Sequence, residues 1–128
     1  METRQKILVV DDDNALLILL SIMLSRLGYE VASADGGKTG LSIFLKNEFD
    51  MVFSDYEMPG MKGDELASVI KARDTKQPVV LITAYAELLQ SSGNPLTGVD
   101  WLISKPFLLE NLRQAIAKVT SAAAKGPA

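Results

Sequence analysis

Five short runs typical of strands, most of them aliphatic and the second one weaker, alternate along this chain with longer stretches of helical periodicity. This alternation constrains the fold more than any other feature. The runs cover residues 7–10, 30–33, 51–54, 78–82 and 101–104. Between them, apolar residues recur at the spacing typical of helices that bury one face. Strands that alternate with helices form parallel sheets with right-handed crossovers. The sequence therefore predicts a single α/β sandwich.

The expected helices occupy the intervals between these runs. The first is capped by Asp13 or Asn14 and extends to about Leu27, where Gly28 ends it. Three more are expected over residues 38–46, 64–73 and 109–123. Their inward-facing residues are predicted to be Leu41, Phe44 and Leu45 in the first of these, Leu66, Val69 and Ile70 in the second, and Leu112, Ile116 and Val119 in the third.

Two of the helical segments look poor. The segment after the fourth run is expected to be helical only over about residues 87–90, because Ser91, Ser92, Gly93, Asn94 and Pro95 follow. The last helix follows Leu108, which cannot act as an N-cap, and a missing cap typically costs ~1 kcal/mol. We expect an ordered core over about residues 6–123 of a single domain, 1–128, and a tail over residues 124–128.

Composition excludes several classes of function. The 128 residues carry a net charge of −3 without a basic stripe, so nucleic acid is a poor direct partner. The absence of cysteine and histidine excludes disulfides, histidine metal sites, Ser-His triads and phosphohistidine on this chain. The most apolar stretch, residues 15–24, is too short to span a bilayer. Three aspartates precede it, unlike in a signal peptide, so we expect a soluble, cytoplasmic protein.

Polar residues follow four of the five aliphatic runs. In "KILVVDDDNALL" the first run ends in three consecutive aspartates, although crowded carboxylates repel one another. The residues at these ends are Asp11, Asp12 and Asp13 after the first run, Asp55 after the third, Thr83 after the fourth and Lys105 after the fifth. In open α/β sheets, ligands bind beyond the carboxyl ends of the strands. If these strands are neighbours, the side chains converge on one site.

The chemistry of this set is specific. Carboxylate oxygens suit Mg²⁺, which prefers one or two carboxylates together with a phosphate. Lys105 offers a compact positive charge to a phosphoryl oxygen, and Thr83 offers a hydroxyl donor. A carboxylate can itself be the nucleophile and form an aspartyl-phosphate. The plainer alternative is that the three aspartates form a solvated helix cap, a role that we assign to Asp13.

The stretches "ILVVDDD", "DMVFSDYEMPGMKG", "VVLITAY" and "SKPF" resemble, in order and spacing, the receiver domains of response regulators in two-component signalling. The resemblance covers essentially the whole chain. It implies a flavodoxin-like (βα)5 three-layer sandwich, with a five-stranded parallel sheet in the order 2-1-3-4-5.

The resemblance also implies a role for each residue of the set. Asp55 is the phosphoacceptor. The Mg²⁺ ligands are Asp12, Asp11 acting largely through water, Asp55 and the main-chain carbonyl of Glu57, and Mn²⁺ can substitute for Mg²⁺. Thr83 and Lys105 hold the phosphoryl oxygens, and the Lys105–Pro106 peptide bond is cis. Glu57 and Tyr85 tune the lifetime of the phosphorylated state.

The implied reaction is phosphoryl transfer to Asp55 from a histidine kinase or a histidine phosphotransfer protein, followed by hydrolysis. The domain assists both steps without being a turnover enzyme, and it switches contacts with an output partner that the sequence does not identify. In this family the kinase docks near the first helix and the loop after the fifth strand. The corresponding residues are Ala15, Ile18, Ile22, Pro106 and Phe107. Plain core packing is the alternative for the three helix residues.

Two departures from the family keep alternative functions open. Receivers often carry an aromatic residue three positions before the lysine, where this chain has Leu102, and Trp101 should face the other way. This departure and the poor fourth helix leave open an interaction scaffold without regulated phosphorylation. A phosphatase of the haloacid dehalogenase type would use an aspartate after the first strand. "DDDNALL" lacks the threonine that follows in that family, and Asp55 would be unexplained.

Overall fold

The structure is a computed structural model, and it describes residues 5–91, 96 and 98–125. Five strands form one sheet: β1 (Lys6–Val10), β2 (Glu30–Ala34), β3 (Met51–Asp55), β4 (Val79–Thr83) and β5 (Trp101–Ser104). Their order across the sheet is β2-β1-β3-β4-β5, and every neighbouring pair is parallel. The predicted strand order is confirmed.

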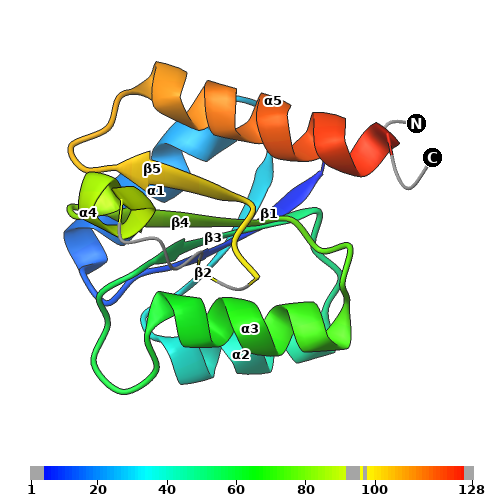
Figure 1. The fold of residues 1–128 in the computed structure, drawn as a ribbon. Helices are drawn as coiled ribbons and strands as arrows, with labels where there is room; N and C mark the ends of the chain where they lie inside the picture. Colours follow the sequence, from blue (N-terminus) through cyan, green and yellow to red (C-terminus); the bar gives the residue numbers. More distant parts are fainter. Residues whose placement is uncertain (1–4, 92–95, 97, 126–128) are drawn as a thin grey trace.

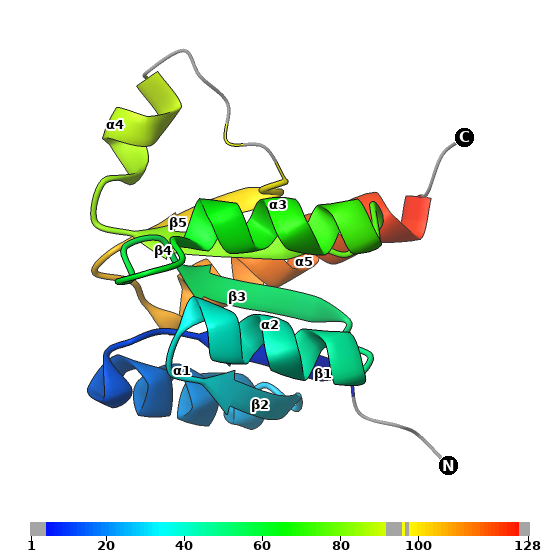
Figure 2. The same ribbon diagram turned by 90° about the horizontal axis from the view of Figure 1, so that it is seen from below.

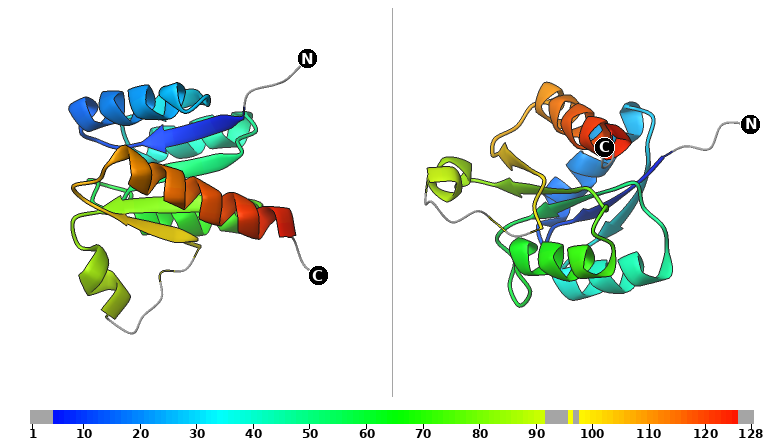
Figure 3. Two further views of the ribbon diagram at one scale, coloured as in Figure 1. Left: turned by 90° about the horizontal axis from the view of Figure 1, so that it is seen from above. Right: turned by 45° about the vertical axis from the view of Figure 1, so that its right-hand side comes forward.

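The described residues form five helices: α1 (Asn14–Arg26), α2 (Gly37–Lys46), α3 (Gly63–Arg73), α4 (Ala86–Ser91) and α5 (Leu109–Lys125). The first four connect successive strands, and α5 follows β5. α1 and α5 cover one face of the sheet, and α2 and α3 cover the other (Figures 1 and 3). Figure 2 shows α4 standing apart from the other helices on the β5 side of the sheet. This is the expected three-layer sandwich. Within the described ranges, no helix is both long and apolar enough to cross a bilayer.

The central strands are apolar without alternation because helices cover both of their faces. On β1, Ile7 and Val9 belong to the core that α1 and α5 complete. Leu8 and Val10 alternate with them and belong to the core that α2 and α3 complete. All four side chains are fully buried. The rigid centre of the sheet thus holds the residues that follow each strand.

The first helix begins and ends at the predicted residues. The Asp13 carboxylate accepts hydrogen bonds from the amides of Ala15 and Leu16, at 3.0 and 3.3 Å, so Asp13 is the N-cap. Gly28 follows with a φ of +100°, a conformation that glycine adopts without strain. The alternative cap, Asn14, is instead the first helical residue.

The prediction of an inward-facing side chain is wrong for Leu45 on α2 and Val69 on α3, whose exposed fractions are 46% and 37%. The reason is that small residues make part of the contact with the sheet. A Cβ atom at Gly40 would lie 2.8 Å from Val10 Cγ2, so α2 approaches β1 through its backbone. On α3 the buried Ala67 has the same role. A pattern of bulky residues alone misses such contacts.

The last two helices can be compared with the predictions for their lengths and ends. α4 has six residues, so the prediction of a short helix is confirmed. The predicted break at Ser92–Pro95 lies outside the described residues. At the start of α5, the Asn111 side chain accepts a hydrogen bond of 2.7 Å from the amide of Leu108, which replaces the missing cap in part. α5 continues to Lys125, past the predicted end near Ala123.

The loop between β3 and α3 closes tightly against the end of β3. The amide of Gly63 donates a hydrogen bond of 3.0 Å to the carbonyl of Tyr56. A Cβ atom at Gly63 would overlap the carbonyl oxygen of Asp55 and lie 2.9 Å from Tyr56 Cα. Glycine at this position therefore lets the loop return to the residue that ends β3.

We predict that Gly63→Ala lowers the free energy of unfolding by about 1–3 kcal/mol, because the added methyl group forces the backbone at Asp55 to shift. Urea unfolding of both proteins measures this difference. Gly36→Ala is the matched control, since a Cβ atom there has no neighbour within 4 Å. Equal losses in the two variants would contradict the steric argument.

Candidate functional site

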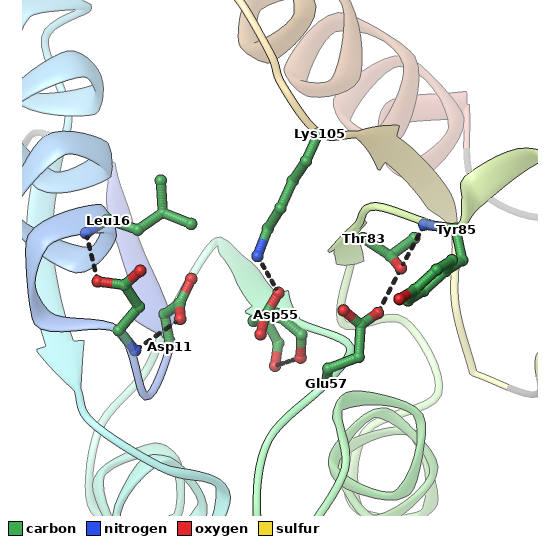
Figure 4. Close-up of polar contacts among 9 residues, drawn as sticks. Asp11, Leu16, Asp55, Glu57, Thr83, Tyr85 and Lys105 are labelled. Carbon is green, nitrogen blue, oxygen red and sulfur yellow. Dashed lines mark hydrogen bonds and ion pairs between the residues drawn. The ribbon is translucent and has the colours of Figure 1, made fainter.

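Four neighbouring strands bring polar side chains to one edge of the sheet (Figure 4). Asp11 follows β1, Asp55 ends β3, Thr83 ends β4 and Lys105 follows β5. Asp55 is paired in register with Ile82 on β4, one residue before Thr83. All four residues lie at the carboxyl ends of parallel strands, beside the place where the strand order reverses. The predicted convergence is therefore present.

Three carboxylates form the acidic part of the site. Oxygen atoms of Asp11, Asp12 and Asp55 lie within 4.8 Å of one another. Asp11 and Asp55 are 0% and 4% exposed, whereas Asp12 is exposed at the mouth of the site. The amide of Asp13 donates a hydrogen bond of 2.9 Å to Asp11 Oδ1, while the Asp13 carboxylate caps α1. The site thus has two buried acidic groups and one at its entrance.

Lys105 reaches across β4 to the acidic groups. Its Nζ atom lies 2.7 Å from Asp55 Oδ1, and the lysine side chain is 25% exposed. The Lys105–Pro106 peptide bond is cis, as the resemblance implies. The ion pair joins the end of β3 to the loop after β5, so the lysine charge lies at the oxygen atoms of Asp55.

The Thr83 hydroxyl makes two hydrogen bonds on the side of the site away from Asp11 (Figure 4). It donates one of 2.6 Å to Glu57 Oε1, and it accepts one of 3.0 Å from the amide of Tyr85. Thr83 is fully buried, whereas Glu57 is exposed and Tyr85 is 55% exposed. Thr83 therefore contacts two other predicted site residues, Glu57 and Tyr85.

The environment of Asp11 disfavours its charge. Burial raises the pKa of Asp11 from 3.8 to about 6, and the negative charge of Asp55 adds to this effect. The hydrogen bond from the Asp13 amide and the charge of Lys105 act in the opposite direction. The repulsion expected among the crowded carboxylates contributes to this rise through the charges of Asp55 and Asp12. The main cause of the rise, however, is burial and not repulsion.

The pKa of Asp55 is also raised, mainly by burial, although Lys105 opposes the rise through its hydrogen bond and its charge. Burial alone would lower the pKa of Lys105. The hydrogen bond and charge of Asp55, with smaller contributions from Asp11 and Glu57, raise it instead. Lys105 therefore remains charged at neutral pH, and one ammonium group faces several carboxylates.

The donor set fits a hard divalent cation. Asp11 Oδ2 is buried and has no hydrogen-bond partner among the described residues. Buried carboxylate oxygens are almost always paired or bound to a metal, because an unpaired buried charge is costly. Three carboxylates and no softer ligand favour a cation such as Mg²⁺ over a transition metal. The site therefore has the ligands and the unmet charge that a divalent metal would satisfy.

The predicted docking residues lie partly on the surface. Ile18 and Ile22 on α1 are 61% and 48% exposed, and Ala15 is exposed at the start of the same helix. Plain core packing is therefore wrong for these three residues. Pro106 is exposed, whereas Phe107 is partly buried and packs against the α1–α5 core. An exposed apolar surface thus extends along α1, which begins directly after the three aspartates.

The departure from the family pattern at Leu102 lies on β5, and Trp101 faces the other way as expected. Trp101 is 37% exposed and Leu102 is partly buried, while Ile103 belongs to the core on the α1–α5 side. Because side chains alternate along a strand, Trp101 and Ile103 lie on one face and Leu102 on the other. Leu102, an aliphatic residue, therefore occupies the position that is often aromatic in the family.

Sequence reasoning missed the hydrogen bond between the Glu57 side chain and Thr83. The two residues are 26 positions apart, and the sequence assigns Glu57 a role only through its carbonyl and its position after Asp55. No periodicity signals such a pair. The only available signal is topological, since β3 and β4 are neighbours and the residues that follow them can meet.

Comparison with known proteins identifies the family. The model of the response regulator receiver domain matches residues 7–117. Sporulation initiation phosphotransferase F of Bacillus subtilis is 34% identical over 114 residues, which cover 89% of this chain and 92% of that protein. Chemotaxis protein CheY-3 of Vibrio cholerae is 34% identical over 122 residues, which cover 93% and 94%. Sensor protein GacS of Pseudomonas syringae is 31% identical over 128 residues, but this chain spans only 14% of its length.

Solved structures agree with this identification. The CheY-like receiver domain protein of Methanospirillum hungatei has a TM-score of 0.87 at 29% identity, covering 98% of this chain and all of that one. Response regulator TrrA of Thermotoga maritima, solved in complex with Mg²⁺ and BeF, has a TM-score of 0.81 at 31% identity and covers 90% and 98%. This chain therefore belongs to the response regulator receiver domain family and is a phosphoacceptor signalling domain of two-component systems.

Proposed function

We propose that Asp55 accepts a phosphoryl group from the phosphohistidine of a histidine kinase or a histidine phosphotransfer protein. The observation that carries this proposal is the position of Asp55, whose carboxylate is buried among acidic groups with Lys105 Nζ at 2.7 Å. The similarity to sensor kinases and to chemotaxis proteins supports such partners. The partner supplies the histidine, because this chain has none.

The transfer exchanges one bond to phosphorus for another. A carboxylate oxygen of Asp55 forms the new P–O bond as the P–N bond of the phosphohistidine breaks, and the electron pair returns to the imidazole nitrogen of the partner. In the second step of the cycle, hydrolysis, water attacks phosphorus, the P–O bond to Asp55 breaks and inorganic phosphate leaves. The domain assists both steps without acting as a turnover enzyme on a separate substrate.

Asp11, Asp12 and Asp55, with the main-chain carbonyl of Glu57, would hold Mg²⁺, for which Mn²⁺ can substitute. The exposed Asp12 suits direct ligation, and the deeper Asp11 suits contact through water. A bound divalent cation supplies positive charge that offsets the charge of the carboxylates and of an incoming phosphoryl group. The buried, unpaired Asp11 Oδ2 supports this assignment.

The remaining site residues would orient the phosphoryl group. Lys105 already contacts Asp55 and can shift its ammonium group to a phosphoryl oxygen. The Thr83 hydroxyl lies at the end of the neighbouring strand and can donate to a second oxygen. Glu57 and Tyr85, which contact Thr83, are placed to tune the lifetime of the phosphorylated state.

The partner docks, in this proposal, on the exposed apolar surface of α1 formed by Ala15, Ile18 and Ile22, with Pro106 and Phe107 beside it. Isolated apolar residues on a surface need no explanation, but two isoleucines one turn apart form a continuous strip. This strip runs from the acidic cluster, so a helix lying on it could bring its histidine to Asp55. The surface therefore suits the helices of a histidine-bearing partner.

The domain then acts on an output partner through protein contacts. We propose that residues 1–128 form one receiver unit that works in the cytoplasm, alone or as part of a longer regulator. The net charge of −3 and the absence of a basic stripe argue against direct contact with nucleic acid. Phosphorylation would change which protein surface is presented.

We expect intact-protein mass spectrometry to detect one added phosphoryl group after incubation with Mg²⁺ and acetyl phosphate, and none in Asp55→Asn. The amide has no free carboxylate oxygen to attack phosphorus. Asp35→Asn is the matched control, because Asp35 is exposed just after β2 at the same edge of the sheet. If a small donor and a cognate kinase both leave the wild type unmodified, an interaction scaffold replaces the phosphoacceptor in this proposal.

Without metal, the melting temperature should fall between about pH 4 and about pH 6. Because the pKa of Asp11 is raised from 3.8 to about 6 in the folded state, its stabilising contribution is complete below about pH 4 and is lost as pH rises through about 6. Mg²⁺ should therefore raise the melting temperature more at the higher pH. Calorimetry checks both trends, and Asp11→Asn should flatten the first. A pH-independent melting temperature in metal-free wild type would exclude this role of Asp11.

Ile18→Asp should slow phosphotransfer from a cognate kinase at least tenfold, because a charge would be buried in the docking surface. Phosphorylation by acetyl phosphate and the melting temperature should change little, since Ile18 is 61% exposed. Leu45→Asp is the matched control, with a similarly exposed leucine on α2 across the sheet. Normal transfer to the Ile18 variant would rule out docking on α1.

A further inference from the structure

The hydrogen bond between Thr83 and Glu57 has a consequence for the proposed phosphoryl site. We propose that the Glu57 carboxylate is a resting-state latch that holds the Thr83 hydroxyl away from Asp55 and competes with the phosphoryl group for its proton. The latch is the 2.6 Å hydrogen bond from Thr83 Oγ1 to Glu57 Oε1 (Figure 4). This inference rests on the proposed function of Asp55.

The hydroxyl of Thr83 has a single proton to donate. That proton is directed to Glu57, and the oxygen atom already accepts a hydrogen bond from the amide of Tyr85 at 3.0 Å. The Tyr85 bond uses a lone pair and holds the oxygen in place without using the proton. Thr83 can therefore donate to a phosphoryl oxygen only after its bond to Glu57 breaks.

The competing acceptor is strong because it is charged. Hydrogen bonds to a carboxylate are shorter and roughly twice as strong as those between neutral groups, and 2.6 Å is at the short end of the usual range. Because Thr83 is fully buried, solvent does not offer its hydroxyl a replacement acceptor when this hydrogen bond breaks. Breaking the latch therefore costs free energy that weakens binding of the phosphoryl group.

The charge of Glu57 also acts directly on the site. Burial is the main cause of the raised pKa of Asp55, and the negative charge of Glu57 raises it further. The same charge also raises the pKa of Lys105. A phosphoryl group on Asp55 would add further negative charge beside it. Repulsion alone could thus weaken phosphoryl binding, and a test of the latch must separate repulsion from competition for the proton.

The exposure of Glu57 makes the latch reversible. The glutamate side chain lies at the surface, so it can turn into water once Thr83 leaves it, while its main chain stays in the loop after β3. The hydrogen bond therefore sets a threshold that a phosphoryl group can exceed. It does not block the site.

The test uses beryllium fluoride with Mg²⁺ as the phosphoryl mimic and the full chain. Titration calorimetry of wild type, Glu57→Gln, Thr83→Val and the double variant forms a double-mutant cycle. Glutamine keeps the shape of the side chain but weakens the hydrogen bond. We expect Glu57→Gln to tighten binding about fivefold when Thr83 is present. In the Thr83→Val background, Glu57→Gln should change the logarithm of the dissociation constant by less than about half as much.

Each outcome decides the matter. Equal tightening in both backgrounds means that Glu57 acts by repulsion alone, which overturns the latch, and so does the absence of any effect of Glu57→Gln. Wild type that binds the mimic while Asp55→Asn does not supports the proposed function independently of the latch. If wild type fails to bind, both proposals fall. Glu48→Gln, beside the amino end of β3, makes the same charge change and should leave binding unchanged.

A second measurement examines the latch without any ligand. The Thr83 hydroxyl proton should exchange slowly with solvent in the wild type, because it is buried and bonded to Glu57. Nuclear magnetic resonance should show faster exchange in Glu57→Gln and a shifted amide resonance for Tyr85, which donates to the same oxygen. Identical exchange and an unmoved Tyr85 resonance would overturn the latch even if the affinity for the mimic changes.

Discussion

The ion pair between Lys105 and Asp55 is the interaction on which the site depends. A buried carboxylate without a partner costs several kcal/mol, and this fold buries two, Asp11 and Asp55, side by side. One ammonium group at 2.7 Å from Asp55 cannot neutralise both, which agrees with the raised pKa of Asp11. The site is therefore held together as an incompletely neutralised cluster. Such a cluster gains stability from added positive charge and responds to added negative charge.

The sheet is what makes this arrangement possible. Parallel strands end at one edge, and the paired register of β3, β4 and β5 brings Asp55, Thr83 and the loop of Lys105 together. The apolar residues on both faces of β3 and β4 are fully buried, so the ends of these strands cannot move apart easily. Loops supply the adjustable groups, including Glu57 and Tyr85. A rigid frame with exposed, movable side chains suits a site that must accept and release the same group.

The sequence predicts the strands and the strand-end residues well because each has a local signal. An uninterrupted aliphatic run means a strand covered on both faces, and a charged residue directly after it must lie at the sheet edge. The failures occur where contacts are not local. Leu45 and Val69 are exposed because Gly40 and Ala67 approach the sheet, and a glycine carries no hydrophobic signal. The Glu57–Thr83 hydrogen bond depends on how the loop after β3 meets the end of β4, which composition and periodicity do not encode.

Glu57 shows how one residue could serve opposite needs of a switch. Its main-chain carbonyl is proposed to bind the cation that favours phosphorylation, whereas its carboxylate withholds the Thr83 proton that would stabilise the product. The first role does not depend on the side chain, so substitutions at this position can change the second role alone. The strength of the resting state could thus vary while the acidic cluster and Lys105 stay fixed. Because Glu57 is exposed, such substitutions would disturb packing little, and the affinity for the phosphoryl group becomes adjustable separately from the stability of the fold.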